Sequence, residues 1–431
     1  MKNKVIFSIL IVLVALSSCN YFNKKQDQKD IINKAVDVCK KYRFVYLAME
    51  VRTGKTLTSL GIASALGCKN VLFLTKKKAI TSINDDYDML CPNSFTLFTI
   101  NYESMHKLPN VKWDFIVVDE AHSLGAFPKP SKRARGVRDI IKKCKPIVCL
   151  MSGTPTPESY SQMYHQVFGV PSNPFKEYTN FYKFAKKYVN VTQRKINSLF
   201  VNDYSKGLVS ILDAMKPMTI AYTQKEAGFI STIDEEIMWV PMNDITYDMT
   251  KRLSTHRVVE GKDEVILGDT PVKLMMKLHQ LYSGTIKFES GNSMILDYTK
   301  ANYINYKFIG KKIGIFYKFK EELKLLKDVY GDTICTELEE FNNTDKSIAL
   351  QIVSGREGIS LRKAEALVYY NIDFSATSYW QSRDRMTTKD RKNSKVYWVF
   401  SEGGIEKDIY KAVIKKKDYT VRHFKKDLLN L

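Results

Sequence analysis

Short apolar runs alternate with helix-like segments over the first 165 residues of the chain. The runs lie at 44–49, 71–75, 95–100, 115–120 and 147–152. Because these runs are continuous rather than alternating, they predict strands that are buried on both faces of a sheet. Apolar residues at helical spacing over 31–42 and 57–66 predict helices, whereas the polar stretch 20–30 indicates a linker. The alternation predicts a parallel sheet covered by helices on both faces.

The same rhythm returns from about residue 305. Strands are predicted at 313–317, 348–353, 366–372 and 396–400, and helices at 320–330 and 405–414. The intervening stretch has weak periodicity, although Leu274, Leu278 and Leu281 have core spacing on a helix. We therefore predict an α/β fold with two parallel-sheet lobes and a mostly helical insertion between them. The expected bounds are 1–20 for a leader, 21–165 for the first lobe, 166–300 for the insertion and linker, and 301–431 for the second lobe.

The first predicted strand ends in a turn that holds Gly54, and Lys55 and Thr56 follow it directly. A strand, a glycine turn, Gly-Lys-Thr and a helix together predict a phosphate cradle of backbone N–H groups. In such a cradle the lysine reaches the β/γ-phosphates of a nucleotide and the threonine hydroxyl holds Mg²⁺. Met49 stands where this pattern usually has glycine. Taken alone, the stretch also fits an ordinary strand–turn–helix.

Two further predicted strands end in polar residues. Asp119 and Glu120 close the strand 115–120, and Ser152 and Thr154 follow the strand that begins at Ile147. Open α/β sheets bind ligands at the carboxyl ends of their strands. There one carboxylate can hold Mg²⁺ and the next can activate a water molecule. The small hydroxyl residues and the stiff proline turn after Ser152 are suited to sensing the state of a nucleotide.

In this order, Gly-Lys-Thr, Asp-Glu-Ala-His and Ser-Gly-Thr-Pro resemble the motifs of superfamily-two helicases and translocases. Residues 312–319, 354–361 and 379–385 resemble the fourth, fifth and sixth motifs of the same superfamily. The wording Glu-Gly-Ile-Ser-Leu and the long gap before the fourth motif are most similar to the Swi/Snf-like branch, including phage-encoded DNA helicases. The resemblance extends over roughly residues 25–425. It implies two RecA-like lobes with a nucleotide between them.

The resemblance also implies a role for each matching residue. Catalysis would fall to Lys55, Glu120, Gln381 and Arg385; nucleotide contact to Gln28, Arg52, Thr53, Gly54, Lys55, Thr56 and Gly358; Mg²⁺ to Thr56 and Asp119; and coupling of hydrolysis to motion to His122, Ser152 and Thr154. Gln28 is the candidate for contacting adenine because Ile31 and Ile32 follow at suitable spacing, and Gln26 is the alternative.

Two positions depart from the family pattern. The sixth motif usually has a second arginine where this chain has Thr388, and Arg383 and Arg391 are the alternative arginines. Arg52 is larger than the small residues common in phosphate loops. It is expected either to lie over the nucleotide or to point to solvent.

The formal net charge is +21 and the pI is about 9.4. Such an excess favours a polyanionic partner, nucleic acid first and an anionic membrane second, and the alternative is a generally basic solvated surface. The expected nucleic-acid contacts are Lys76, Lys77, Lys132, Arg133 and Arg135, and the last three are expected to lie in a loop. Tyr102 is expected to lie near the path of the bound nucleic-acid strand. The resemblance implies single- or double-stranded DNA as substrate, and replication or recombination proteins as partners.

The N-terminus carries a different signal. A basic start, an apolar run over 5–16 and Leu-Ser-Ser before Cys19 resemble an export signal or a lipoprotein box, and the run is short for a membrane span. An ATP-driven enzyme needs the cytoplasm, so cytoplasmic action is expected, with inner-membrane association through residues 1–19 as the alternative. The seven cysteines show neither Cys-x-x-Cys pairs nor metal spacing, which predicts reduced thiols rather than zinc or disulfides.

Together these features predict an ATP hydrolase that uses ATP and Mg²⁺ to move along or unwind DNA. One alternative is a double-stranded DNA translocase that remodels bound protein without separating strands. Another is a nucleic-acid binder without catalytic activity, against which the intact set of Lys55, Thr56, Asp119 and Glu120 argues.

Overall fold

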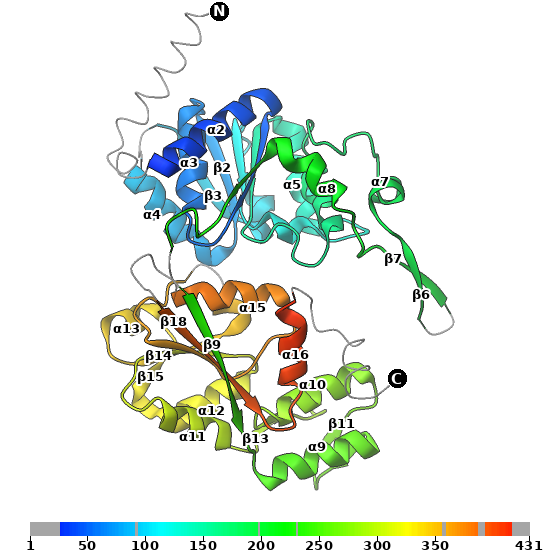
Figure 1. Cartoon of the computed structure of the whole chain (residues 1–431), viewed down its shortest axis with the longest axis vertical. Coiled ribbons are helices and arrows are strands. Elements are labelled where there is room, and N and C mark those ends of the chain that lie inside the picture. Colours follow the sequence, from blue (N-terminus) through cyan, green and yellow to red (C-terminus); the bar gives the residue numbers. More distant parts are fainter. Residues whose placement is uncertain are drawn as a thin grey trace, which may run out of the picture. The chain divides into compact units, whose positions relative to one another are not determined.

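The computed structural model describes residues 26–90, 94–196, 199–229, 232–355, 359–386 and 393–415. The chain divides into two compact units, the first ending at Gly228 and the second beginning at Phe229. Each unit holds one six-stranded sheet, and all strand pairs within these two sheets are parallel (Figure 1). The predicted α/β class with two parallel-sheet lobes is confirmed.

The first sheet has the strand order β3-β2-β4-β5-β1-β8. Its strands are β1 (Phe44–Met49), β2 (Asn70–Thr75), β3 (Thr96–Asn101), β4 (Phe115–Val118), β5 (Ile147–Met151) and β8 (Thr219–Tyr222). The first five match the predicted apolar runs, and β8 was not predicted. Because the strands are parallel, the carboxyl ends of β1, β4 and β5 lie at one edge of the sheet.

Helices cover both faces of this sheet. They are α2 (Gln26–Tyr42), α3 (Lys55–Ala65), α4 (Ile80–Leu90), α5 (Lys132–Cys144) and α6 (Met163–Val167). Val45 and Leu47 of β1 belong to the cluster that α2 and α3 share, whereas Phe44 and Tyr46 belong to the cluster on the opposite face with α5 and α6. Since α2 begins at Gln26, the linker expected over 20–30 is wrong in its second half.

The basic segment after Asp-Glu-Ala-His is also different from the expected loop. Residues from Lys132 form helix α5, and the Ser131 side chain caps it by accepting a hydrogen bond from the Ala134 amide at 3.1 Å. The buried residues of α5 are Ala134, Val137, Ile141 and Cys144, which fall on one helical face. The basic residues between them hid this apolar stripe from the sequence pattern.

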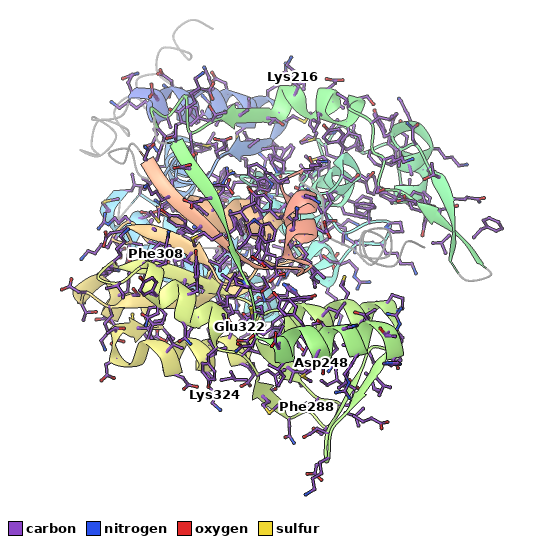
Figure 2. All side chains as sticks on the ribbon, turned by 60° about the horizontal axis from the view of Figure 1, so that its bottom comes forward. Lys216, Asp248, Phe288, Phe308, Glu322 and Lys324 are labelled. Carbon is purple, nitrogen blue, oxygen red and sulfur yellow. The ribbon has the colours of Figure 1, made fainter. Side chains whose placement is uncertain are left out.

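The second sheet has the order β15-β16-β14-β17-β18-β9. Its strands are β9 (Thr232–Val240), β14 (Ile313–Tyr317), β15 (Ile334–Cys335), β16 (Ser347–Gln351), β17 (Ala366–Tyr369) and β18 (Asn393–Ser401), and its unit includes helices α12 (Lys320–Tyr330), α14 (Ile352–Gly355), α15 (Ala376–Arg383) and α16 (Glu406–Val413). The strand predicted over 348–353 therefore ends at Gln351. Helix α12 is amphipathic: Glu322 is buried and Lys324 is exposed, and both are labelled in Figure 2.

Residues 166–300 contain strands as well as helices, and they do not form a unit of their own. Besides β8 and β9, they hold α7 (Phe181–Tyr188), α8 (Ser210–Met215), α9 (Asp244–His256), α10 (Pro271–Leu281), the start of α11 (Thr299–Lys307), and the two-stranded pairs β6 (Thr192–Ile196) with β7 (Leu199–Asp203), β10 (Val258–Glu260) with β11 (Val265–Leu267) and β12 (Thr285–Lys287) with β13 (Ser293–Ile295). Figure 1 shows α7 and the β6–β7 ribbon extending away from the first sheet. The structural boundary at Gly228 lies inside the expected insertion. Leu274, Leu278 and Leu281 are buried on α10 as predicted.

A charged pair lies inside the second unit. The Lys300 Nζ of α11 is 2.9 Å from the Glu406 Oε1 of α16, and both side chains are fully buried. The other carboxylate oxygen of Glu406 has no hydrogen-bond partner among the described residues. The charge of this carboxylate is therefore balanced mainly by Lys300.

Five buried cysteines carry free thiols: Cys39, Cys68, Cys144, Cys149 and Cys335. Burial raises the pKa of Cys39 and Cys68 to about 12. Cys19 and the whole leader expected over 1–20 lie outside the described residues, as does Cys91. In the part of the chain that the structure covers, no helix combines the length and apolar character that crossing a membrane requires.

Candidate active site

The loop between β1 and α3 contains two residues with positive φ, Gly54 and Arg52. Gly54 adopts a φ of 87°, and a Cβ added there would lie 1.9 Å from the Gln28 Nε2. Glycine is favoured because it tolerates positive φ, and a Cβ at this position would displace the Gln28 amide from the loop. Arg52 also has a positive φ, of 63°, which costs a non-glycine residue about 1–2 kcal/mol. Such strain concentrates at functional sites.

Lys55 is held at the mouth of this loop. Its Nζ donates hydrogen bonds to the carbonyl oxygens of Met49, at 3.0 Å, and of Glu50, at 3.1 Å. A Cβ added to Gly153 would lie 3.6 Å from the same Nζ, so the turn after β5 also borders the lysine. The Met49 side chain is buried in the core, while its backbone carbonyl accepts the hydrogen bond from Lys55. A methionine can therefore occupy the position where the family pattern usually has glycine. An ammonium held by two carbonyls can be taken over by phosphate oxygens.

Glu50 is a residue that the sequence analysis missed. Its N–H donates to the Tyr222 carbonyl at 3.0 Å, and its Oε2 accepts from the Gln224 N–H at 2.7 Å. Its carbonyl accepts from the Thr53 hydroxyl at 2.7 Å as well as from Lys55. The backbone N–H, backbone carbonyl and carboxylate of Glu50 therefore all help to fix the loop. The only sequence signal was one acidic residue at the end of an apolar strand, just before the glycine turn.

Gln28 lies against the phosphate loop, as its expected role requires. It is buried, and its Nε2 donates to the Thr53 carbonyl at 3.4 Å. Its Oε1 has no hydrogen-bond partner among the described residues, and a buried amide oxygen without a partner is costly unless a ligand supplies a donor. Gln26 instead donates to Asp30 on the exposed side of α2 at 2.9 Å. Gln28 therefore lies beside the phosphate loop, whereas Gln26 is exposed and bonded within α2.

The acidic pair at the end of β4 is tightly held. The Asp119 carboxylate accepts hydrogen bonds from the Thr75 hydroxyl, at 2.8 Å, and from the Glu120 N–H, at 2.9 Å. The Tyr102 hydroxyl donates to the Asp119 carbonyl, and Tyr102 is buried, so its expected place near a nucleic-acid strand is wrong. Glu120 has a φ of 48°, a second strained position at this edge of the sheet.

Opposite pKa shifts separate these two carboxylates. Burial and then the charge of Glu120 raise the pKa of Asp119 to about 6. Burial alone would raise the pKa of Glu120. The pKa is instead lowered to about 2, because the interaction with His122 and then the charges of Lys55 and Lys76 outweigh the effect of burial. Neighbouring acids with divergent pKa values are typical of sites where one group takes up or releases protons and the other stays ionised.

The residues present fit a magnesium ion. Asp119 is a buried carboxylate whose raised pKa shows that its negative charge is poorly compensated within the protein. The described residues hold no group of three or more His, Cys, Asp or Glu side chains that could bind a metal. Mg²⁺ is commonly held by one or two carboxylates together with phosphate oxygens and water, so the single carboxylate of Asp119 fits this kind of site.

Binding of Mg²⁺·ADP is expected to release protons from Asp119 near pH 6 and essentially none at pH 8, because the pKa of Asp119 is raised. The metal needs the ionised carboxylate, which is half populated near its pKa and complete two pH units above it. Affinity should accordingly fall as the pH drops below 6. Calorimetry in two buffers of different ionisation enthalpy measures the released protons.

Asp119→Asn is the control for this measurement, because protons released by the nucleotide itself are common to both proteins. The difference between wild type and Asp119→Asn should be confined to the acidic pH. An equal difference at pH 6 and pH 8 would contradict the assignment.

The turn after β5 brings the expected coupling residues together. The Nδ1 of His122 lies 2.9 Å from the Ser152 hydroxyl and 3.2 Å from the Glu120 Oε2. The Ser152 hydroxyl also accepts from the Thr154 N–H at 3.1 Å, while the Thr154 hydroxyl has no partner in the described structure. Gln166, not found from sequence, donates to the carbonyl of Pro155 at 2.8 Å and fixes this turn. The water-activating candidate and the turn are thus connected through one imidazole.

Gln381 and Arg385 belong to the second unit. Gln381 is buried, and its Oε1 has no partner among the described residues. Arg385 donates from Nε to the Gln381 carbonyl at 2.9 Å and from Nη1 to the Ile359 carbonyl at 3.3 Å. Arg385 therefore joins the segments that resemble the fifth and sixth motifs. Gly358 and Thr388 lie outside the described residues.

Arg383, one alternative for the second arginine, is engaged inside the second unit. Its Nη1 is 2.8 Å from the Glu235 Oε1, and its guanidinium lies 4.4 Å from the centre of the Trp380 ring. Glu235 also accepts hydrogen bonds from the side chains of Tyr379, Trp398 and Tyr410. Arg383 thus has a structural role on α15. The other alternative, Arg391, is outside the described residues.

Three of the five cations expected to contact nucleic acid are exposed: Lys77, Lys132 and Arg135. Arg133 instead pairs with Glu103, and its guanidinium lies 5.4 Å from the centre of the Tyr102 ring. Lys76 precedes the short turn Lys77–Ala79 and contributes positive charge near Glu120. The exposed cations therefore come from two places, the end of β2 and the start of α5.

No family model matches the chain, and no curated protein matches it. The solved structures that are similar to it include two SWI2/SNF2 ATPase cores of Sulfolobus solfataricus. The core in complex with dsDNA is 16% identical, with 94% of this chain and 92% of that chain covered and a TM-score of 0.41. The core domain alone is 14% identical, with 90% and 88% covered and a TM-score of 0.41. Likeness at this level does not establish activity, and neither structure bears on the expected resemblance to phage-encoded helicases.

Proposed function

We propose that the protein is an ATP-dependent translocase or helicase that hydrolyses ATP with Mg²⁺ and moves along DNA. The observation that carries this proposal is the convergence of three strand ends at one edge of the first sheet. There β1 leads to Lys55 on its two carbonyls, β4 to the acidic pair with divergent pKa values, and β5 to the turn at Ser152. A binder without catalytic activity has no need of such a set.

The proposed roles follow from this arrangement. Lys55 binds the β/γ-phosphates, Thr56 and Asp119 hold Mg²⁺, and Glu120, fully ionised at neutral pH, accepts a proton from the attacking water. The Mg²⁺ ion, when bound, neutralises charge that develops on the phosphates. Gln381 and Arg385 are proposed to stabilise charge on the γ-phosphate from the second unit. His122, Ser152 and Thr154 would transmit the change at Glu120 to the rest of the first unit.

A nucleic acid is proposed as the track because the net charge is +21 and exposed cations follow β2 and begin α5. DNA rather than RNA is proposed from the resemblance of the motifs to the Swi/Snf-like branch. Cytoplasmic action belongs to this proposal because the reaction requires ATP. Replication or recombination proteins are the proposed partners. Separation of the two DNA strands is the finer proposal, and movement along duplex DNA without separation is its alternative. A strand-displacement assay run beside a triplex-displacement assay distinguishes the two.

The proposed function is tested by the steady-state ATPase rate with single-stranded DNA, duplex DNA and RNA. DNA should raise the rate more than RNA does. The variant Lys55→Ala should show no activity with any nucleic acid, because it lacks the phosphate-binding ammonium. Activity that is absent from the wild type, or that persists in Lys55→Ala, would contradict the proposal.

A further inference from the structure

The chain that leaves the first unit runs directly past the phosphate loop. Strand β8 pairs with β1 in parallel, from Thr219 opposite Tyr46 to Tyr222 opposite Met49. Both strands therefore end at the same level, where the phosphate loop starts. The Glu50 N–H continues the ladder by donating to the Tyr222 carbonyl at 3.0 Å.

Gln224 donates two hydrogen bonds to the phosphate loop. Its backbone N–H donates to the Glu50 Oε2 at 2.7 Å, and its side-chain Nε2 donates to the Val51 carbonyl at 3.0 Å. The first of these bonds has a charged acceptor, and such hydrogen bonds are shorter and stronger than neutral ones. Gln224 lies 174 residues after Glu50 in the chain, so this contact joins the loop to the end of the unit.

The segment that carries Gln224 is a closed turn, which we name the exit turn, residues 223–228. The Glu226 carboxylate accepts from the Thr223 N–H at 2.7 Å and from the Thr223 hydroxyl at 2.8 Å. Backbone bonds from Ala227 to Thr223 and from Gly228 to Lys225 complete it. Because internal hydrogen bonds hold the exit turn together, a displacement of Gln224 is expected to displace the whole turn.

The second unit begins immediately afterwards. Only three residues lie between Gly228 and Thr232, the first residue of β9, so the Cα atoms of these two residues are at most about 14 Å apart. Strand β9 is nine residues long and pairs with β18 along its full length. Its Glu235 binds Arg383 and Tyr379 of α15, the helix that also carries Gln381. Along the chain, the exit turn therefore comes shortly before the strand whose Glu235 contacts α15.

The phosphate loop cannot keep its present hydrogen bonds when it binds a nucleotide. Lys55 must release the carbonyls of Met49 and Glu50 to reach phosphate oxygens. The loop then reshapes around Glu50, whose N–H and carboxylate are both bonded to the exiting chain. Resting on the proposed nucleotide binding, we propose that Gln224 is a positioning residue that links the phosphate loop to the exit turn, so that nucleotide occupancy is transmitted to the start of the second unit.

Hydrogen–deuterium exchange of the full chain, with and without Mg²⁺·ADP, tests this proposal. In the wild type, exchange should slow over 50–56 and change over 223–229. In Gln224→Leu, which removes the bond to Val51 but keeps the backbone bond to Glu50, the response over 50–56 should remain and the response over 223–229 should be largely lost. The KM for ATP should rise about fivefold, the equivalent of one net hydrogen bond, with a smaller change in kcat.

Lys225→Leu is the matched control, because Lys225 is the exposed neighbour on the same turn. It should respond as the wild type does in both segments. Slowed exchange over 50–56 with no response over 223–229 in the wild type would overturn the proposal, as would Gln224→Leu behaving like Lys225→Leu. No response in either segment of the wild type would overturn the proposed nucleotide binding and this inference with it.

Discussion

Replacing Glu120 with glutamine is expected to lower kcat for ATP hydrolysis about 10³-fold while nucleotide binding persists. Glu120 is ionised at neutral pH because its pKa is lowered to about 2, so it is available as a base throughout the working range. Glutamine preserves the size of the side chain, but it cannot take a proton from water. Steady-state hydrolysis and titration with a fluorescent nucleotide measure the two effects separately.

Glu103→Gln provides a matched control on the same unit. The Glu103 side chain is 58% exposed and pairs with Arg133 at the surface, where ion pairs contribute little. Its kcat should stay close to that of the wild type. A Glu120→Gln protein that retains more than a tenth of the wild-type kcat would exclude Glu120 as the base.

Lys300→Met is expected to destabilise the second unit by about 3–5 kcal/mol, because it leaves the buried Glu406 carboxylate without its cation. The Glu406 Oε2 already lacks a hydrogen-bond partner among the described residues, and a Cβ at Gly404 would lie 2.0 Å from it, so little space remains for a replacement. The double variant Lys300→Met/Glu406→Met should recover most of the loss, since apolar pairs of similar volume replace buried ion pairs well. Urea unfolding followed by tryptophan fluorescence measures all three proteins.

The matched control for this pair lies on the same helix. Lys411 pairs with Asp408 of α16 at 3.1 Å, and the Lys411 side chain is 60% exposed. Lys411→Met should change the free energy of unfolding by less than about 1 kcal/mol. Equal effects of Lys300→Met and Lys411→Met, or a double variant no more stable than Lys300→Met, would show that the buried pair is not what holds these helices together.

The parallel sheets were predictable because strands buried on both faces leave continuous apolar runs in the sequence. Strand β9 left no such run, since it lies at the edge of its sheet and carries Asp234, Glu235 and Glu236 in succession. Glu235 is satisfied by partners 144 to 175 residues away, which no local pattern reveals. Helix α5 was missed for a similar reason, because basic residues surround its narrow apolar stripe.

For the site, the residues at strand ends were predictable because the chemistry fixes both their type and their order. Lys55, Asp119, Glu120 and Ser152 are local to the turns that carry them. The residues that hold those turns come from elsewhere in the chain, as Gln166 and Gln224 do. Their positions depend on tertiary packing, and an isolated glutamine in a sequence gives no indication of it.

The buried thiols have a practical consequence. A buried thiol reacts with an alkylating reagent mainly when the surrounding structure opens. Cys39, Cys68, Cys144 and Cys149 lie in the first unit and Cys335 in the second. In a background where Cys19 and Cys91 are replaced by serine, mass spectrometry of the alkylated peptides would measure the rate at which each unit opens. A single alkylation experiment would therefore report the opening rates of both units separately.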